Sequence, residues 1–104
     1  MSNYLLLYHG GSRPEDPAEQ AKVMQAWTDW FGKLGSALVD GGNPTGNARN
    51  ISASGAVSQA NGGSPTGYSI IQAADIDSAA ALAKGCPVLA GGASLQVVEV
   101  LDMM

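Results

Sequence analysis

The stretch Tyr4-Leu5-Leu6-Leu7-Tyr8 decides the fold, because it predicts a β-strand that is apolar on both faces. Neighbouring side chains of a strand point to opposite sides, so both sides of this strand need cover from water. A chain of 104 residues has room for one domain, residues 1–104, and for one layer of helices. That layer covers one face of a sheet. We therefore expect the other face to pack against a second copy of the chain, as a homodimer.

Composition and charge narrow the classes of partner. Hydrophobic residues make up 45% of the chain and charged residues 13%, which is low for a soluble domain and compatible with an oligomer. The formal net charge is −4, and the five basic residues are scattered singly instead of forming a stripe that follows a phosphate backbone. We expect no nucleic-acid partner.

The remaining composition argues against metals, cofactors and membranes. Cys86 is the only cysteine, so no intrachain disulfide forms, which fits a reducing compartment and a cytoplasmic location. With one histidine and no phosphate-binding glycine motif, the sequence predicts neither a metal site nor a nucleotide cofactor. No apolar run approaches the roughly 18 residues of a membrane span, and the N-terminus has no cationic lead.

A long helix is predicted to begin at Asp16-Pro17, an N-cap followed by a proline at the first helical position. Glu19 stands where a capping box places its acid. Gly35 provides a C-terminal stop. Apolar residues recur between these ends at spacings of three and four, which predicts one buried stripe. The stripe comprises Val23, Met24, Trp27, Trp30, Phe31 and Leu34.

Two further strands follow, with an unusual segment between them. Residues 37–40 form a short apolar run that ends in glycines, and residues 68–73 are rich in β-branched and aromatic side chains. Residues 41–67 contain one charge, Arg49, among many Gly, Ser, Asn and Ala residues. This composition fits an irregular hairpin or, equally, a mobile flap.

The chain then predicts a short helix and a last strand. Asp75 or Asp77 caps a helix that runs through residues 79–84, and Gly85 and Pro87 end it. Residues 95–101 form a strand that is again apolar on both sides. The element order is βαββαβ, the α+β plan of a ferredoxin-like sandwich with two helices on one face of an antiparallel sheet. Two such sheets face to face form a dimeric α/β barrel.

Short motifs also carry a family likeness. They are Tyr4-Leu5-Leu6-Leu7-Tyr8, the Trp-rich first helix, Leu38-Val39-Asp40-Gly41-Gly42, Gly67-Tyr68-Ser69-Ile70-Ile71 and Val97-Val98-Glu99-Val100. In order and spacing they resemble the YCII-related proteins, most closely the branch called DGPF. The resemblance covers nearly the whole chain. It implies a dimeric α/β barrel with a cleft between each sheet and its helices.

The resemblance also implies a possible chemistry, from which this chain departs. Some members of the family carry an acid/base dyad, a His on the first helix and an Asp near the end of the second. The matching stretches hold Met24 and Trp27 and, after the second helix, Gly85-Cys86-Pro87, so the dyad is not carried over. The tetrapeptide Asp-Gly-Pro-Phe is replaced by residues 63–66, Gly-Ser-Pro-Thr.

His9 is the candidate catalytic residue, because it ends the first strand and is the side chain that titrates near neutral pH. Asp40, at the end of the second strand, is its candidate partner, since a nearby carboxylate orients an imidazole and raises its basicity. Each has a simpler interpretation. In that interpretation His9 only hydrogen-bonds its neighbours, and Asp40 only shapes the turn before Gly41 and Gly42.

Aromatic side chains are the candidate ligand-binding residues, because their rings offer large and oriented contact area. Aromatic residues at helical spacing are more often core, and this alternative stays open. The candidates are Tyr8, Trp27, Trp30 and Tyr68. The leading hypothesis is a homodimer that binds a small apolar or aromatic molecule between sheet and helices, with any acid/base work at His9. The alternative is a non-catalytic dimerisation or sensing module whose cleft its own tryptophans fill.

Overall fold

The computed structural model describes residues 1–11, 15–60 and 63–102 of the chain. It is an α+β structure in which four antiparallel strands form the main sheet. Their order across the sheet is β2 (Leu38–Asp40), β5 (Gly67–Ala73), β1 (Ser2–Gly10) and β6 (Ala93–Glu99). The predicted strand at residues 4–8 is confirmed and lies at the centre, between β5 and β6.

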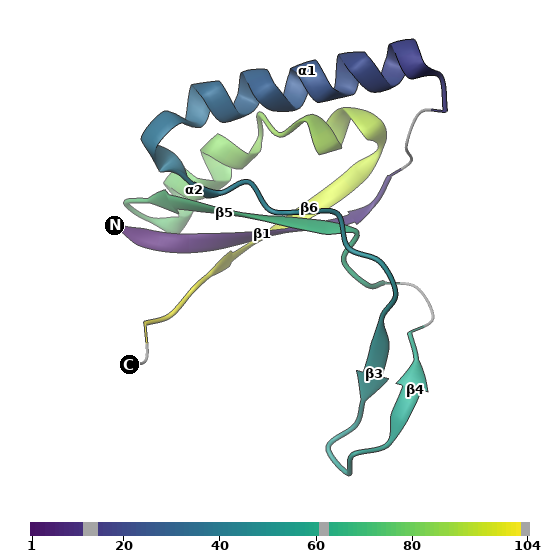
Figure 1. The fold of residues 1–104 in the computed structure, drawn as a ribbon. Coiled ribbons are helices and arrows are strands. Elements are labelled where there is room, and N and C mark those ends of the chain that lie inside the picture. Colours follow the sequence, from purple (N-terminus) through teal and green to yellow (C-terminus); the bar gives the residue numbers. More distant parts are fainter. Residues whose placement is uncertain (12–14, 61–62, 103–104) are drawn as a thin grey trace.

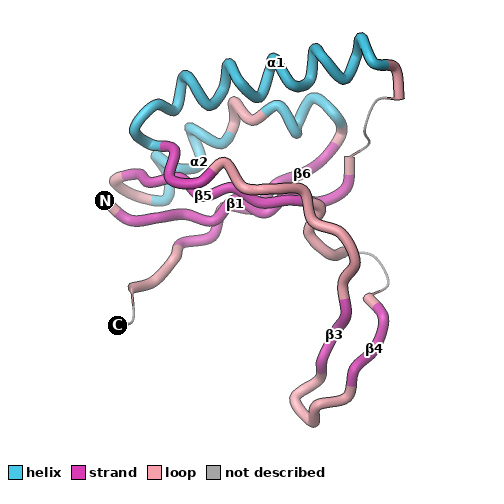
Figure 2. The backbone as a smooth tube through the Cα atoms, in the orientation of Figure 1, coloured by secondary structure: helices cyan, strands magenta, loops and turns pink. Residues whose placement is uncertain are grey.

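Two helices, α1 (Pro17–Leu34) and α2 (Ile76–Ala83), lie on the same side of this sheet (Figure 1). Short 3₁₀ turns follow each helix, η1 (Gly35–Ala37) after α1 and η2 (Pro87–Gly91) after α2. A second, two-stranded sheet of β3 (Arg49–Ile51) and β4 (Val57–Gln59) projects from the opposite side (Figure 2). Within the segment 41–67 the structure thus forms a hairpin at residues 49–59, and residues 61–62 of the segment lie outside the described residues.

The helix ends follow the local sequence. Asp16 caps α1 by accepting a 3.0 Å hydrogen bond from the Ala18 amide, and Gly35 ends the helix with a φ of 53°. Asp75 is the cap of α2 and accepts a 2.7 Å hydrogen bond from the Ser78 amide. Glu19 does not close a capping box in the hydrogen bonds described; its carboxylate pairs with Lys22 on the helix surface at 3.2 Å.

The buried stripe of α1 is shorter than predicted. Trp30 and Leu34 are buried and Trp27 and Phe31 are partly buried, as expected. Val23 and Met24 were wrongly assigned to the core, since their exposed fractions are 39% and 68%. Every residue from 17 to 26 is exposed, so the first half of α1 has too little structure beneath it to bury the stripe.

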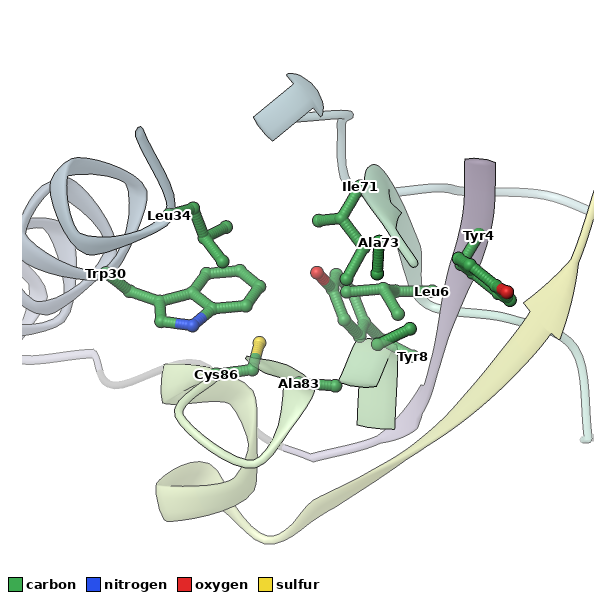
Figure 3. Packing of buried hydrophobic residues seen from close by; sticks show 10 residues of the cluster. Tyr4, Leu6, Tyr8, Trp30, Leu34, Ile71, Ala73, Ala83 and Cys86 are labelled. Atoms are coloured by element: carbon green, nitrogen blue, oxygen red, sulfur yellow. The ribbon is translucent and has the colours of Figure 1, made fainter. Parts of the chain in front are cut away.

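The core lies between the sheet and the two helices (Figure 3). Side chains from β1 and β5 meet those of α1, α2 and the turn after α2. The buried members are Tyr4, Leu6, Tyr8, Trp30, Leu34, Ile71, Ala73, Ala79, Ala83 and Cys86. The sheet contributes alternate residues only, because every second side chain points to the helix side.

Candidate functional site

The sheet divides the predicted site residues between its two faces. Tyr8 lies on the helix side of β1 and is 5% exposed, whereas the next residue, His9, points to the other side and is partly exposed. In β5, Tyr68 lies on the same side as His9. The tryptophans belong to α1, on the side of Tyr8. The six predicted residues therefore do not line one pocket.

On the helix side, four aromatic rings pack against one another. Trp27 makes edge contacts with Tyr8 and Trp30, each with ring centroids 5.7 Å apart, and lies 5.6 Å from Phe31. Trp30 is 4% exposed, and its Nε1 donates a 3.3 Å hydrogen bond to the Leu82 carbonyl of α2. These side chains fill the space between sheet and helices in which a ligand was expected.

Tyr8 also begins a buried hydrogen-bond chain. Its hydroxyl donates to Ser69 Oγ at 2.6 Å, and Ser69 Oγ donates to the Gly41 carbonyl at 2.8 Å. Burial raises the pKa of the Tyr8 phenol well above its ordinary value, so the phenol stays protonated at neutral pH. Sequence reasoning missed Ser69, although a serine among the alternating residues of an apolar strand is a signal for such a bond.

Cys86 lies in the core, next to the Tyr8 hydroxyl that begins these hydrogen bonds. It is 3% exposed, and burial raises the pKa of its thiol, so the nucleophilic thiolate is disfavoured. Figure 3 shows its sulfur pointing into the packed cluster beside Trp30. Cys86 is thus a small apolar member of the core.

His9 and Asp40 are not brought together. Asp40 is paired with Ile70, and Ile70 with Leu5, so Asp40 is level with Leu5 and not with His9. Strand β5 lies between them. Two strand spacings across and four residues along separate their Cα atoms by roughly 16 Å. Asp40 Oδ1 instead accepts a 2.8 Å hydrogen bond from the Gly42 amide, which is the turn role that the sequence also allowed.

The other face of the sheet is open and has an apolar centre bordered by polar residues, Gln96 opposite Leu7 and the paired Asn3 and Gln72. Leu5 on the central strand is flanked by Ile70 on β5 and by Val98 on β6, and Leu7 is flanked by Tyr68. All five side chains are partly exposed, and both helices lie on the opposite side (Figure 1). We call these five residues the open face. Within the described chain it is the surface that the architecture leaves without a covering layer.

His9 lies at one end of the open face. Ser94 of β6 is directly opposite it, and Tyr68 of β5 is its diagonal neighbour, within reach of long side chains. A histidine, a phenol and a hydroxyl therefore meet where the apolar surface ends. This grouping was not predicted, because it depends on which strands are paired.

Surface depressions lie elsewhere. One is bordered by Ser36, Gln72, Ala74 and Ser78, where the end of β5 meets η1 and α2. Gln72 Nε2 donates a 2.7 Å hydrogen bond to the Ser36 carbonyl there. Another lies between the start of β1 and the chain after β6. Neither includes His9, Asp40 or the aromatic candidates.

The described residues hold no cluster of metal ligands and no helix suited to span a membrane. Residues 1–11, 15–60 and 63–102 contain no group of three or more His, Cys, Asp or Glu side chains placed to hold a metal ion. Within the same ranges, no helix combines the length and the apolar character needed to cross a membrane.

No protein-family model, curated protein or solved structure gives a match to this chain.

Proposed function

We propose that this protein works as a homodimer whose two subunits pack through their open faces. The observation that carries the proposal is the cross-strand patch of Leu5, Leu7, Tyr68, Ile70 and Val98 on the side of the sheet opposite the helices. Burying such side chains is favourable by about 25 cal/mol per Å² of apolar surface. The patch lies on three neighbouring strands of one sheet, and a two-fold axis between two subunits brings it against itself.

The same proposal covers the fold family. The strand order β2-β5-β1-β6, with one helix after β1 and one after β5, supports a ferredoxin-like assignment with the β3–β4 hairpin as an insertion. Two such sheets face to face make a dimeric α/β barrel. The short motifs and the Trp-rich α1 support a relationship to the YCII-related proteins. A single free and buried cysteine supports a cytoplasmic location.

Packing inside each subunit favours a dimerisation or sensing module over an enzyme with a cleft under its helices. Trp27, Trp30, Phe31 and Tyr8 occupy that space themselves. The ring contacts of Trp27 and Trp30 and the hydrogen bonds of Tyr8 and Ser69 pack this layer against the sheet. The sheet then presents one fixed apolar surface for association.

A second candidate function rests on the neighbours of His9. Ser94 and Tyr68 border this histidine at the edge of the proposed interface, where a second subunit closes the space above them. We propose that any small apolar or aromatic ligand binds there, with His9 as the acid/base group. The test is a metabolite panel read by thermal shift, because a ligand that prefers the native form raises its melting temperature. A hit that His9→Gln and Tyr68→Phe both abolish supports the site, and a hit that both leave unchanged removes it.

The dimer is tested by a charge at the centre of the open face. Leu5→Lys places an ammonium between Ile70 and Val98, and we expect it to produce monomers in sedimentation velocity. Met24→Lys is the matched control, since Met24 is 68% exposed on α1, away from the sheet. Equal mass for the two variants, both dimeric, contradicts the proposed interface.

A further inference from the structure

The β3–β4 hairpin is ordered by its own hydrogen bonds, although it buries none of its side chains. The Gly55 amide donates to the Ser52 carbonyl, and the Ser52 amide donates to the Ala56 carbonyl, both at 2.9 Å. All residues of β3 and β4 are exposed. An isolated two-stranded hairpin is at best marginally stable in water. Its regular pairing therefore suggests a surface against which it packs.

Its two faces differ in character. Ile51 is directly paired with Val57, and their exposed fractions are 69% and 64%. Asn50 and Ser58, on the other face, are also paired and are polar. Arg49 and Gln59 share the face of Ile51 and Val57, so this face has an apolar cross-strand pair next to the turn and a polar pair next to the root. The face of Asn50 and Ser58 has no apolar pair in β3 and β4.

The hairpin is held firmly where it leaves the sheet. The Thr45 amide donates to the Thr66 carbonyl at 3.0 Å, and the Thr66 amide donates to the Tyr8 carbonyl at 2.6 Å. Thr45 Oγ1 adds a 2.5 Å hydrogen bond to the Pro65 carbonyl. From this root the hairpin projects away from the helices, toward the side of the open face (Figure 1).

The projection is long compared with the gap between packed sheets. The nine steps from Thr45 to Ser54 span at most about 30 Å at strand spacing, whereas two sheets pack about 10 Å apart. The radius of gyration, 15.2 Å, exceeds the roughly 13 Å of a compact chain of this length. A second subunit seated on the open face therefore lies within reach of the hairpin along its whole length.

The area of the open face is an independent reason to expect further contact between the two subunits. Strands about 4.8 Å apart, paired over seven positions on each side of β1 and extended by the three residues of β2, give a face of roughly 400 Å² in projection. A stable interface buries roughly 800 Å² of surface on each partner. The open face alone is therefore at the small end of stable interfaces, and the two hairpins of a dimer supply further contact.

We propose that the β3–β4 hairpin is an arm that lies along the flank of the second subunit, with Ile51 and Val57 turned toward it. The occupant is a second copy of this chain, and the proposal rests on the homodimer proposed above. Each subunit then holds the other in two places, at the sheet and through the arm. The polar face with Asn50 and Ser58 remains in water.

The two faces of the hairpin provide a matched pair of variants. Ile51→Lys with Val57→Lys replaces the apolar cross-strand pair by two charges, and Asn50→Lys with Ser58→Lys places two charges on the opposite face. We expect the first pair to raise the dimer dissociation constant about tenfold or more, because buried aliphatic contacts are lost. The second pair leaves it close to wild type. Circular dichroism checks that both variants keep the fold.

The outcomes separate the two proposals. If wild type is dimeric and Leu5→Lys dissociates it, but the two hairpin variants have equal dissociation constants, the arm is wrong and the sheet interface stands. If wild type has the mass of one chain, both proposals are wrong. Loss of affinity for the Ile51 and Val57 variant alone supports the arm.

A photocrosslink locates the arm directly. Val57→Cys carries the one accessible thiol of the described chain, since Cys86 is 3% exposed, so a benzophenone maleimide labels it selectively. Protein that carries the benzophenone is mixed with isotopically heavy protein that lacks it, and the mixture is irradiated. We expect light–heavy crosslinked pairs. Crosslinks found only within one chain overturn the proposal.

Discussion

The hydroxyl of Tyr8 on β1 donates a 2.6 Å hydrogen bond to Ser69 Oγ on β5, inside the core and across the pairing of the two strands. Ser69 is completely buried, and it passes the bond on to the Gly41 carbonyl. One serine thus bonds two polar groups, the buried Tyr8 hydroxyl and the part-buried Gly41 carbonyl. The end of β2 is tied to the centre of the sheet through this chain.

Removing the two ends of this bond has unequal effects. Ser69→Ala removes the serine partner of both the Tyr8 hydroxyl and the Gly41 carbonyl, and we expect a loss of about 2 kcal/mol in the free energy of unfolding. Tyr8→Phe removes the donor and leaves Ser69 bonded to Gly41, for a loss of about 1 kcal/mol. Urea denaturation measures both, with the exposed Ser58→Ala as control. A larger loss for Tyr8→Phe contradicts the chain.

The two tryptophans of α1 differ in burial, so replacing them is expected to lower the stability of the protein by different amounts. Trp30→Ala removes a ring that is 4% exposed and bonded to the Leu82 carbonyl, and we expect it to cost about 3–5 kcal/mol. Trp27 is partly exposed, so Trp27→Ala is expected to cost roughly half as much. Thermal unfolding followed by circular dichroism compares them. Equal losses, or the reverse order, show that the aromatic cluster is packed differently.

Gly42 is the glycine that the fold tolerates least in substitution. Its φ is 74°, and a Cβ there is placed 1.6 Å from the Tyr68 carbonyl oxygen, far inside contact distance. We expect Gly42→Ala to lower the melting temperature strongly or to prevent folding, because backbone has to move. Gly46→Ala is the control, since nothing lies within 4 Å of its added Cβ. A near-native melting temperature for Gly42→Ala contradicts the close approach of this loop to β5.

Features set by neighbouring residues could be predicted from the sequence. The caps Asp16 and Gly35 depend on hydrogen bonds and backbone angles within one turn, and both are found. Alternation in residues 4–8 predicted a strand whose two faces both need cover, and the open face at Leu5 and Leu7 agrees with that pattern. Local chemistry and periodicity determine these features.

Features that depend on distant pairing could not be predicted. The separation of His9 from Asp40 arises because β5 is inserted between their strands, which neither residue's surroundings reveal. Met24 follows the apolar period of α1, but its exposure depends on how far the helix extends beyond the elements beneath it. Ser94 came next to His9 only through the register of β1 with β6.

Asp75 makes part of the stability depend on pH. Hydrogen bonds from Ser78 hold the pKa of the Asp75 carboxyl below its usual range, so its contribution is full above about pH 4 and is lost as pH falls through the lowered pKa. We expect Asp75→Asn, which retains a capping side chain, to be less stable than wild type at pH 7. The difference in melting temperature should shrink below about pH 4. A difference that stays constant from pH 7 to pH 2 contradicts this role.

The account depends most on association through the open face, and the mass of the wild-type protein in solution tests it directly. Sedimentation equilibrium over a range of micromolar concentrations should give twice the 10.5 kDa of one chain. Leu5→Lys should shift the mass toward that of one chain at the same concentrations. A wild-type mass of one chain at every concentration contradicts the central claim.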